Sequence, residues 1–346
     1  MMSFRSTARS LFQTCCLFLV CALAPCQPVA IAKPDSPGEL IDLGGYQMHL
    51  WCMGKGEPTV VLSAGSGDFS FDWYLVQPGI AKTTRVCSYD RGGEAWSDLG
   101  PSPLTRRQEA FDLRRALQMA HIPAPYLLVG HSLGGFLAET FVSVYPRDVS
   151  GLVLVDASDW NSLQNINGRT AAMQVFSKNR RVPDARSHFE KSDALSPQAI
   201  TAIQDFVKQY DMVPRIEPPY DKLPNKVQHW RLWALAQPSH WAATQNDFFG
   251  EEAQLLAQWA GASDSPLGDI PLVVLSRKTP ENPNEIDKDH EVHQRELARL
   301  SRRSKLVFVP DSGHHIQLDQ PAAVISATAE MAAEIRLHNG MPIENH

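Results

Sequence analysis

The stretch YLLVGHSLGGF, residues 126–136, decides how this sequence folds. A short apolar run leads into Gly130, and Ser132 lies between that glycine and Gly134. Apolar runs of this kind are typical of strands covered on both faces. Glycines on either side of the serine let a strand and a helix approach closely around a sharp turn, which lifts the hydroxyl to the end of the strand. The pattern G-x-S-x-G therefore predicts a strand, a strained turn that carries Ser132, and a helix.

The composition indicates a globular protein. The chain has 346 residues, of which 43% are hydrophobic and 20% are charged, and its formal net charge is −6. This acidic balance argues against a nucleic-acid binder, because such proteins present clustered basic side chains to phosphates. The length predicts one large domain with an insertion, or two domains.

The first 32 residues are similar to a secretory signal peptide. Two arginines precede the apolar run 11–24, and the small residues Ala30 and Ala32 follow it. The run is shorter than the roughly 20 residues that a spanning helix needs. We therefore expect cleavage near Ala32, a periplasmic or secreted protein and no stable membrane span, with a membrane anchor as the alternative. Cleavage leaves two cysteines, Cys52 and Cys87, which an oxidising compartment favours as a pair.

Apolar segments and helical spacings alternate along the rest of the chain. The segments with strand character are residues 49–53, 59–65, 83–90, 126–132, 150–158, 270–276 and 304–312. Helical spacing relates Ala110, Leu113, Leu117 and Ala120, and again Val324, Thr328, Met331 and Ile335. The alternation predicts an α/β fold with a mostly parallel sheet flanked by helices.

One gap breaks this alternation. Residues 158–269 are too many for a simple crossover, so we expect a helical cap inserted into a core of residues 33–157 and 270–346. The gap holds a group of aromatic residues, namely Trp160, Trp230, Trp233, Trp241, Trp259, Phe248 and Phe249. These side chains either form the core of the cap or line an apolar pocket.

A serine nucleophile needs a base, and the chain offers one in the last loop. A serine hydroxyl reacts once a histidine removes its proton, and that histidine is expected late in the chain after a strand. His314 meets this expectation because Gly313 precedes it directly after the segment 304–312. His315 is the alternative.

These motifs make the chain similar to the α/β-hydrolase superfamily, in particular to its capped branch of secreted serine esterases and related hydrolases. The resemblance spans residues 38–338. It is carried by GHSLGG, SYDRGGEAWSD, GLVLVDAS and SGHHIQLDQP. The chain departs from the family at Gly93-Glu94-Ala95, where relatives usually have G-x-G.

The resemblance implies two backbone N–H groups that hold an oxyanion. Leu133 follows the nucleophile and supplies the first. The loop VVLSAGSGDF resembles the His-Gly-x loop of the family with Ala64 in place of the histidine, so Ser66 is the expected second donor. A plain glycine turn is the alternative for this loop.

The resemblance also places the cysteines and the third catalytic residue. In this fold the second strand runs beside the fourth, which predicts a Cys52–Cys87 disulfide, with free thiols as the alternative. Most relatives carry the acid after the strand at 270–276, but here the first acid in that loop is Glu281. Asp156 ends the preceding strand, as in some relatives, and we expect it to orient the histidine, with Glu281 as the alternative acid. A role for Asp156 as a cap of a helix or loop is the alternative.

Two other patterns do not indicate a functional site. HEVH places His290 and His293 one helical turn apart but lacks the spacing of a zinc-peptidase motif, so we expect a solvated first turn of a helix and no metal. The basic run SRRSK at 301–305 indicates a solvated helix end.

The sequence therefore predicts a serine hydrolase that cleaves carboxylic esters of small to medium apolar substrates through an acyl-enzyme. Ser132, His314 and Asp156 form the expected triad, and no external cofactor is implied. Lactone hydrolysis, peptide hydrolysis and acyl transfer on the same triad stay open, as does a non-catalytic binder of small ligands. The oligomeric state is not indicated.

Overall fold

The computed structural model describes residues 31–101, 105–159, 162–166, 169–172, 196–209, 212–244, 259, 261 and 263–338. The signal-like residues 1–30 and the aromatic residues Trp160, Phe248 and Phe249 lie outside this part of the chain. No helix within the described ranges is long and apolar enough to span a membrane.

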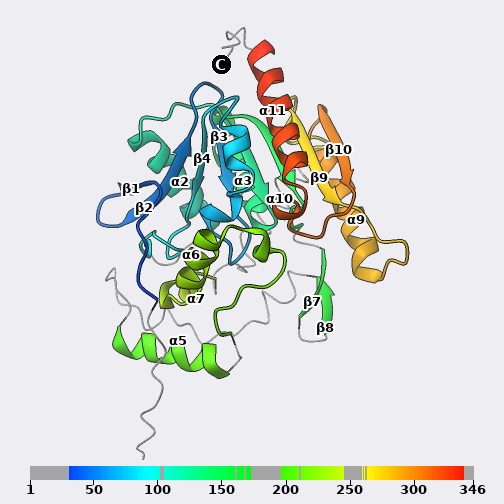
Figure 1. Cartoon of the computed structure of the whole chain (residues 1–346). Helices are drawn as coiled ribbons and strands as arrows, with labels where there is room; N and C mark the ends of the chain where they lie inside the picture. Colours follow the sequence, from blue (N-terminus) through cyan, green and yellow to red (C-terminus); the bar gives the residue numbers. More distant parts are fainter. Residues whose placement is uncertain are drawn as a thin grey trace, which may run out of the picture. The chain divides into compact units, whose positions relative to one another are not determined.

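An eight-stranded sheet forms the centre of the fold (Figure 1). Its strands, in spatial order, are β1 (Glu39–Asp42), β2 (Gln47–Met53), β4 (Val86–Tyr89), β3 (Val60–Ser63), β5 (Tyr126–His131), β6 (Val149–Val155), β9 (Leu272–Arg277) and β10 (Ser304–Val309). The pairs β1–β2 and β2–β4 are antiparallel, and every other neighbouring pair is parallel. This confirms the predicted α/β fold with a mostly parallel sheet and adds β1, which the sequence pattern had not indicated.

Helices cover the sheet on both faces. Their bounds are α1 (Gln77–Ile80), α2 (Arg106–Met119), α3 (Leu133–Val144), α9 (Glu285–Leu297), α10 (Ile316–Asp319) and α11 (Pro321–His338). Short 3-10 turns are η1 (Ser70–Trp73), η2 (Pro146–Asp148) and η4 (Ala298–Leu300). Side chains of α2, α3 and α9 join one buried apolar cluster, and those of α1 and α11 join the other.

The strands contribute side chains to both apolar clusters, because successive side chains of a strand point to opposite faces of the sheet. On β6, Leu152 and Leu154 belong to the first cluster, whereas Val153 and Val155 belong to the second. Both sides of the strand are therefore apolar, which explains the continuous Val and Leu runs of the sequence. Parallel strands covered in this way expose their carboxyl ends at one edge of the sheet, where a site can form.

A disulfide links the antiparallel part of the sheet. Cys52 on β2 is directly opposite Cys87 on β4, and their sulfurs are 2.08 Å apart. The cross-link spans 35 residues, for which loop-closure entropy gives a stabilisation of roughly 3–4 kcal/mol.

The insertion between β6 and β9 contains helices and one strand pair. The helices are α5 (Pro197–Gln209), η3 (Tyr220–Lys222), α6 (Asn225–Leu235) and α7 (Pro238–Thr244), and the strands are β7 (Leu163–Ile166) and β8 (Arg169–Ala172). Figure 1 shows α6 and α7 next to each other below the sheet. The basic run 301–305 leads from η4 into β10, and its arginines pair with Asp269 and Glu334 at the surface.

Tryptophans of α6 pack against the core. The Trp230 ring lies 5.5 Å from Trp96, 6.0 Å from Phe71 and 6.2 Å from Trp51. Trp233 lies 5.3 Å from Trp96, and both α6 tryptophans are buried. Of the two interpretations left open by the sequence, this packing favours a core role for these two residues.

Replacing Trp230 with alanine is therefore expected to destabilise the protein. The change removes a buried ring from an aromatic cluster and leaves a cavity, which costs roughly 3–5 kcal/mol of unfolding free energy. Urea denaturation measures the loss, and Trp241→Ala, at a half-buried position on α7, is the comparison. A small stability change together with an altered substrate-length preference would point to a pocket-lining role instead.

Candidate functional site

A strained turn carries Ser132 between β5 and α3. Its backbone has φ 51° and ψ −121°, a left-handed conformation that L-residues rarely adopt. A Cβ atom on Gly130 would lie 2.3 Å from the Gly134 carbonyl oxygen, and one on Gly134 would lie 2.1 Å from the Ser63 carbonyl oxygen. Both positions therefore require glycine, as the sequence pattern predicted.

The structure brings His314 to Asp156. His314 Nδ1 lies 2.7 Å from Asp156 Oδ2, whereas His315 Nε2 faces the Tyr220 hydroxyl at 2.7 Å. Glu281 is exposed in the loop after β9. The sequence left His315 and Glu281 open as alternatives. In the structure, the histidine and the acid that contact each other are His314 and Asp156.

One pocket of about 490 Å³ contains these groups. Ser132, Asp156 and His314 all line it, and Ser66 and Leu133 lie on its wall. The Ser132 hydroxyl is 3.2 Å from the Ser158 hydroxyl. All five residues that we expected to take part in ester cleavage thus meet at the carboxyl edge of the sheet.

The His314 loop is tied to the turn that carries the serine. His131 directly precedes Ser132, and its Nε2 atom donates to the His314 carbonyl oxygen at 3.0 Å. The His131 ring is buried and lies 4.7 Å from the His314 ring. His131, the second residue of the GHS motif, therefore positions the backbone of the His314 loop. The sequence did not indicate this role.

Asp156 accepts hydrogen bonds on both carboxylate oxygens. Oδ2 faces His314 Nδ1 and also Arg277 Nη1 at 2.5 Å, while Oδ1 accepts from the Arg277 backbone N–H at 2.8 Å. His290 Nε2 lies 3.0 Å from Oδ1. Burial alone would raise the pKa of Asp156, but the hydrogen bonds from His290 and His314 hold that pKa well below its usual range.

His290 corrects the expectation for the HEVH motif. We predicted a solvated first turn of a helix, but His290 lies in the middle of α9 and faces Asp156, and His293 is largely buried against acidic side chains. Sequence spacing could not reveal this, because it says nothing about how α9 packs on β9. Within the described part of the chain, no group of three or more side chains could hold a metal ion.

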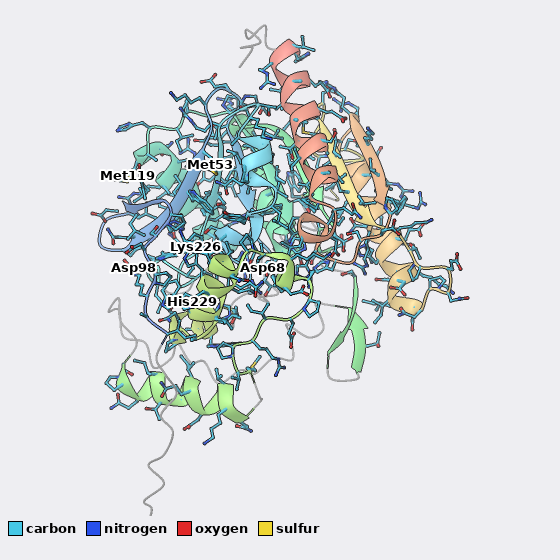
Figure 2. All side chains as sticks on the ribbon, in the orientation of Figure 1. Met53, Asp68, Asp98, Met119, Lys226 and His229 are labelled. Atoms are coloured by element: carbon cyan, nitrogen blue, oxygen red, sulfur yellow. A yellow bond between two sulfur atoms is a disulfide. The ribbon has the colours of Figure 1, made fainter. Side chains whose placement is uncertain are left out.

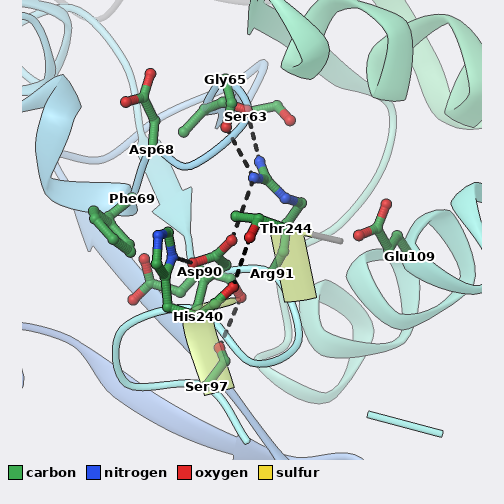
Figure 3. A network of polar contacts seen from close by, with 12 residues as sticks. Ser63, Gly65, Asp68, Phe69, Asp90, Arg91, Ser97, Glu109, His240 and Thr244 are labelled. Carbon is green, nitrogen blue, oxygen red and sulfur yellow. Dashed lines mark hydrogen bonds and ion pairs between the residues drawn. The ribbon is translucent and has the colours of Figure 1, made fainter. Parts of the chain in front are cut away.

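Arg91 braces the loop that contains Ser66. It follows β4 and donates from Nη1 to the Ala64 carbonyl oxygen at 2.7 Å and from Nη2 to the Gly65 carbonyl oxygen at 2.8 Å, as Figure 3 shows for the Gly65 side. Glu94, where the chain departs from the family, binds His240 Nδ1 of α7 at 2.6 Å. The motif after β4 therefore orients the Ser66 loop and connects it to the insertion.

A buried polar cluster links the insertion to the same loop. Asp68, which Figure 2 labels near α6, accepts from the Tyr220 hydroxyl at 2.5 Å and lies 3.3 Å from Arg231 Nη2. Arg231 also pairs with Asp72 and stacks 3.4 Å over the Tyr220 ring. Because the Tyr220 hydroxyl donates its proton to Asp68, His315 Nε2 donates to the Tyr220 oxygen. Burial lowers the pKa of His315 to about 4, so the ring is neutral at pH 7.

Glu139 on α3 is a buried carboxyl whose ionisation opposes folding. Its Oε1 atom has no hydrogen-bond partner among the described residues. Burial, with a smaller contribution from Asp159, raises the pKa of Glu139 well above 4.5. The folded state therefore favours the protonated form, and stability is lost as the pH rises above the pKa of the unfolded chain.

We expect Glu139→Gln to be more stable than the parent protein at pH 8 by about 1–3 kcal/mol, because the parent must either bury a charge or take up a proton when it folds at that pH. At pH 4 the difference should disappear, since both side chains are then neutral. Urea denaturation at the two pH values measures it. An equal difference at both pH values would show that ionisation is not the cause.

Comparisons with known proteins agree with this fold. A family model described as "Alpha/beta hydrolase family" matches residues 60–327. The chain is 34% identical over 127 residues to the "Probable transporter efuK" of Hormonema carpetanum, which covers 34% of this chain and 18% of that protein. It is 34% identical over 109 residues to the "Putative carbamate hydrolase RutD" of Cronobacter turicensis, which covers 31% of this chain and 40% of that protein. Each match thus spans less than half of the relative's length.

A solved structure is similar over nearly its whole length. The thermophilic esterase from Thermogutta terrifontis superposes with a TM-score of 0.59 at 21% identity, covering 86% of this chain and 98% of the esterase. At that identity the likeness shows the fold. Because the family model spans well over half of the chain, this protein belongs to the alpha/beta hydrolase family.

Proposed function

We propose that this protein is a serine-dependent hydrolase of carboxylic esters that works through an acyl-enzyme. The observation that carries the proposal is the 2.7 Å contact between His314 Nδ1 and Asp156 Oδ2 in a pocket that Ser132 also lines. A carboxylate at Nδ1 holds the imidazole in the tautomer whose Nε2 can accept a proton. That arrangement is what a serine nucleophile requires.

In the first half-reaction, Ser132 Oγ attacks the ester carbonyl carbon while His314 Nε2 takes the hydroxyl proton. The carbonyl oxygen becomes an oxyanion, which the backbone N–H groups of Ser66 and Leu133 stabilise. Arg91 supports this step by fixing the two carbonyl groups that precede Ser66. The intermediate collapses when the C–O bond breaks, and His314 gives its proton to the leaving alcohol.

In the second half-reaction, water attacks the acyl group on Ser132. His314 takes a proton from the water, and the tetrahedral intermediate forms against the same two N–H groups. Collapse returns the proton to Ser132 Oγ and releases the carboxylic acid. Asp156 stabilises the imidazolium of His314 in both halves.

The pocket supports substrates of small to medium size, because about 490 Å³ lies within the ordinary range of ligand sites. Its apolar surface comes from the described residues Leu133, Ala157, Leu163 and Ile286. We further propose a periplasmic or secreted location. The signal-like residues 1–32 support it, as does the Cys52–Cys87 disulfide, since disulfides persist in oxidising compartments.

Two assays test the proposal on the purified chain. A fluorophosphonate probe should label Ser132, located by mass spectrometry of the modified peptide. A panel of p-nitrophenyl esters of increasing acyl length should then be hydrolysed with a preference for short to medium acyl groups. No labelling under conditions that label a control esterase would contradict a catalytic role, and labelling without ester turnover would favour another acyl substrate.

A further inference from the structure

We propose that His290 is a positioning residue for the triad: it holds one oxygen of Asp156 so that the other stays aimed at His314. The inference rests on the proposed function, because it assigns a role within the same catalytic machinery. It gives the HEVH motif a purpose other than metal binding.

The argument begins with the Asp156 carboxylate. Four contacts surround its two oxygens, two from Arg277, one from His290 and one from His314. A carboxylate can only accept hydrogen bonds when it is ionised, so each facing nitrogen must carry a proton. The low pKa of Asp156 agrees with a carboxylate that is anionic at neutral pH.

This requirement places the two histidines in opposite tautomers. His314 meets Asp156 through Nδ1, so its proton lies on Nδ1 and its Nε2 is free to act as a base. His290 meets Asp156 through Nε2, so its proton lies on Nε2. One carboxylate therefore fixes two imidazoles, and only His314 presents Nε2 as a proton acceptor.

Helix α9 holds His290 in place on both sides. One turn later, Gln294 Nε2 donates to the carbonyl oxygen of Ala157, the residue that follows Asp156, at 2.8 Å. Just before His290, Asp289 Oδ2 accepts from the Leu163 backbone N–H at 2.6 Å. The helix begins with a capping box formed by Asn284 and Asp287. His290 is thus carried by a rigid element bonded to the segment that follows the triad acid.

The charged groups around the pair come from several elements. Arg277 ends β9 and pairs with Asp156, and His314 approaches from the loop before α10. On α9 itself, Glu291 is held by Thr279 and Arg295, and His293 contacts Asp159. Of the acidic side chains named here, all in the described part of the chain, Asp156 is the one that accepts a hydrogen bond from His290.

Removing His290 should weaken the triad without abolishing it. The Arg277 backbone N–H still holds Oδ1, so Asp156 loses one of its contacts and gains some freedom to rotate. We expect His290→Ala to lower kcat about tenfold with little change in KM, because a hydrogen bond to a charged group typically contributes roughly ten- to a hundredfold. His290→Gln, whose Nε2 can donate to the same oxygen, should stay within about threefold of the parent.

The pH profile gives a readout that a merely structural role would not move. In His290→Ala the carboxylate can turn away from His314 and therefore stabilises the His314 imidazolium less. The acidic limb of kcat/KM should move to lower pH, and it should return in His290→Gln. His229→Ala, which removes an exposed histidine of α6, is the matched control and should leave the profile unchanged.

Nitrogen-15 NMR of histidine-labelled protein tests the tautomers without any assay of activity. At neutral pH, His290 should carry its proton on Nε2 and His314 should carry its proton on Nδ1. The variant His290→Gln should lose the ring-nitrogen signals of His290 and keep those of His314. A His290 protonated on Nδ1 would overturn the inference, as would an unchanged kcat and pH profile in a folded His290→Ala. If the parent protein neither reacts with the fluorophosphonate nor turns over esters, the proposed function fails, while the tautomer result still decides the geometry.

Discussion

Asp156→Asn should lower kcat by about four orders of magnitude. An asparagine in this place can present its NH₂ group to His314 and so favour the tautomer with the proton on Nε2, which cannot accept the Ser132 proton. It also removes the negative charge that stabilises the imidazolium. Steady-state kinetics on the best p-nitrophenyl ester measure the loss, and circular dichroism checks that the variant is folded.

Glu281→Gln is the control for this experiment. Glu281 is exposed and lies outside the described lining of the pocket, so its charge should not affect the chemistry. We expect kcat within about twofold of the parent, as for ordinary surface substitutions. A silent Asp156→Asn together with an impaired Glu281→Gln would move the acid to the loop after β9.

Ser132→Ala should have the largest effect of any single change, a loss of about 10⁶-fold in kcat. Without the hydroxyl no acyl-enzyme forms, and the remaining rate comes from the N–H groups of Ser66 and Leu133 acting on direct attack by water. The control is Ser150→Ala. Ser150 lies near the start of β6, at the end of the strand away from Asp156, so this variant should retain full kcat. A residual rate within a hundredfold of the parent would indicate another nucleophile, for which Ser158, whose hydroxyl lies 3.2 Å from that of Ser132, is the candidate.

Local patterns predicted the parts of the fold that depend on local chemistry. The Val and Leu runs predicted buried strands because a strand covered on both faces cannot alternate polar and apolar residues. The turn at Ser132 was predictable because no side chain fits at Gly130 or Gly134. Strand β1 was missed, since its four residues are mostly exposed and carry no apolar pattern.

The sequence was less informative about contacts between distant segments. Nothing in HEVH indicates that α9 packs beside β9 and brings His290 to Asp156. Likewise, the aromatic residues of the insertion could serve a core or a pocket until their partners Trp51 and Trp96 were known. Such contacts depend on how elements pack in three dimensions, which residue spacing along one element does not encode.

The tryptophans that pack where α6 meets the core can be used as an intrinsic fluorescence probe. Trp96 belongs to the loop after β4, whereas Trp230 and Trp233 belong to the insertion, and all three rings are buried together. Buried indoles fluoresce at shorter wavelength than indoles in water. Separation of α6 from the core would expose these rings and shift the emission to longer wavelength. Intrinsic fluorescence would therefore report any separation of the insertion from the core, without an attached label.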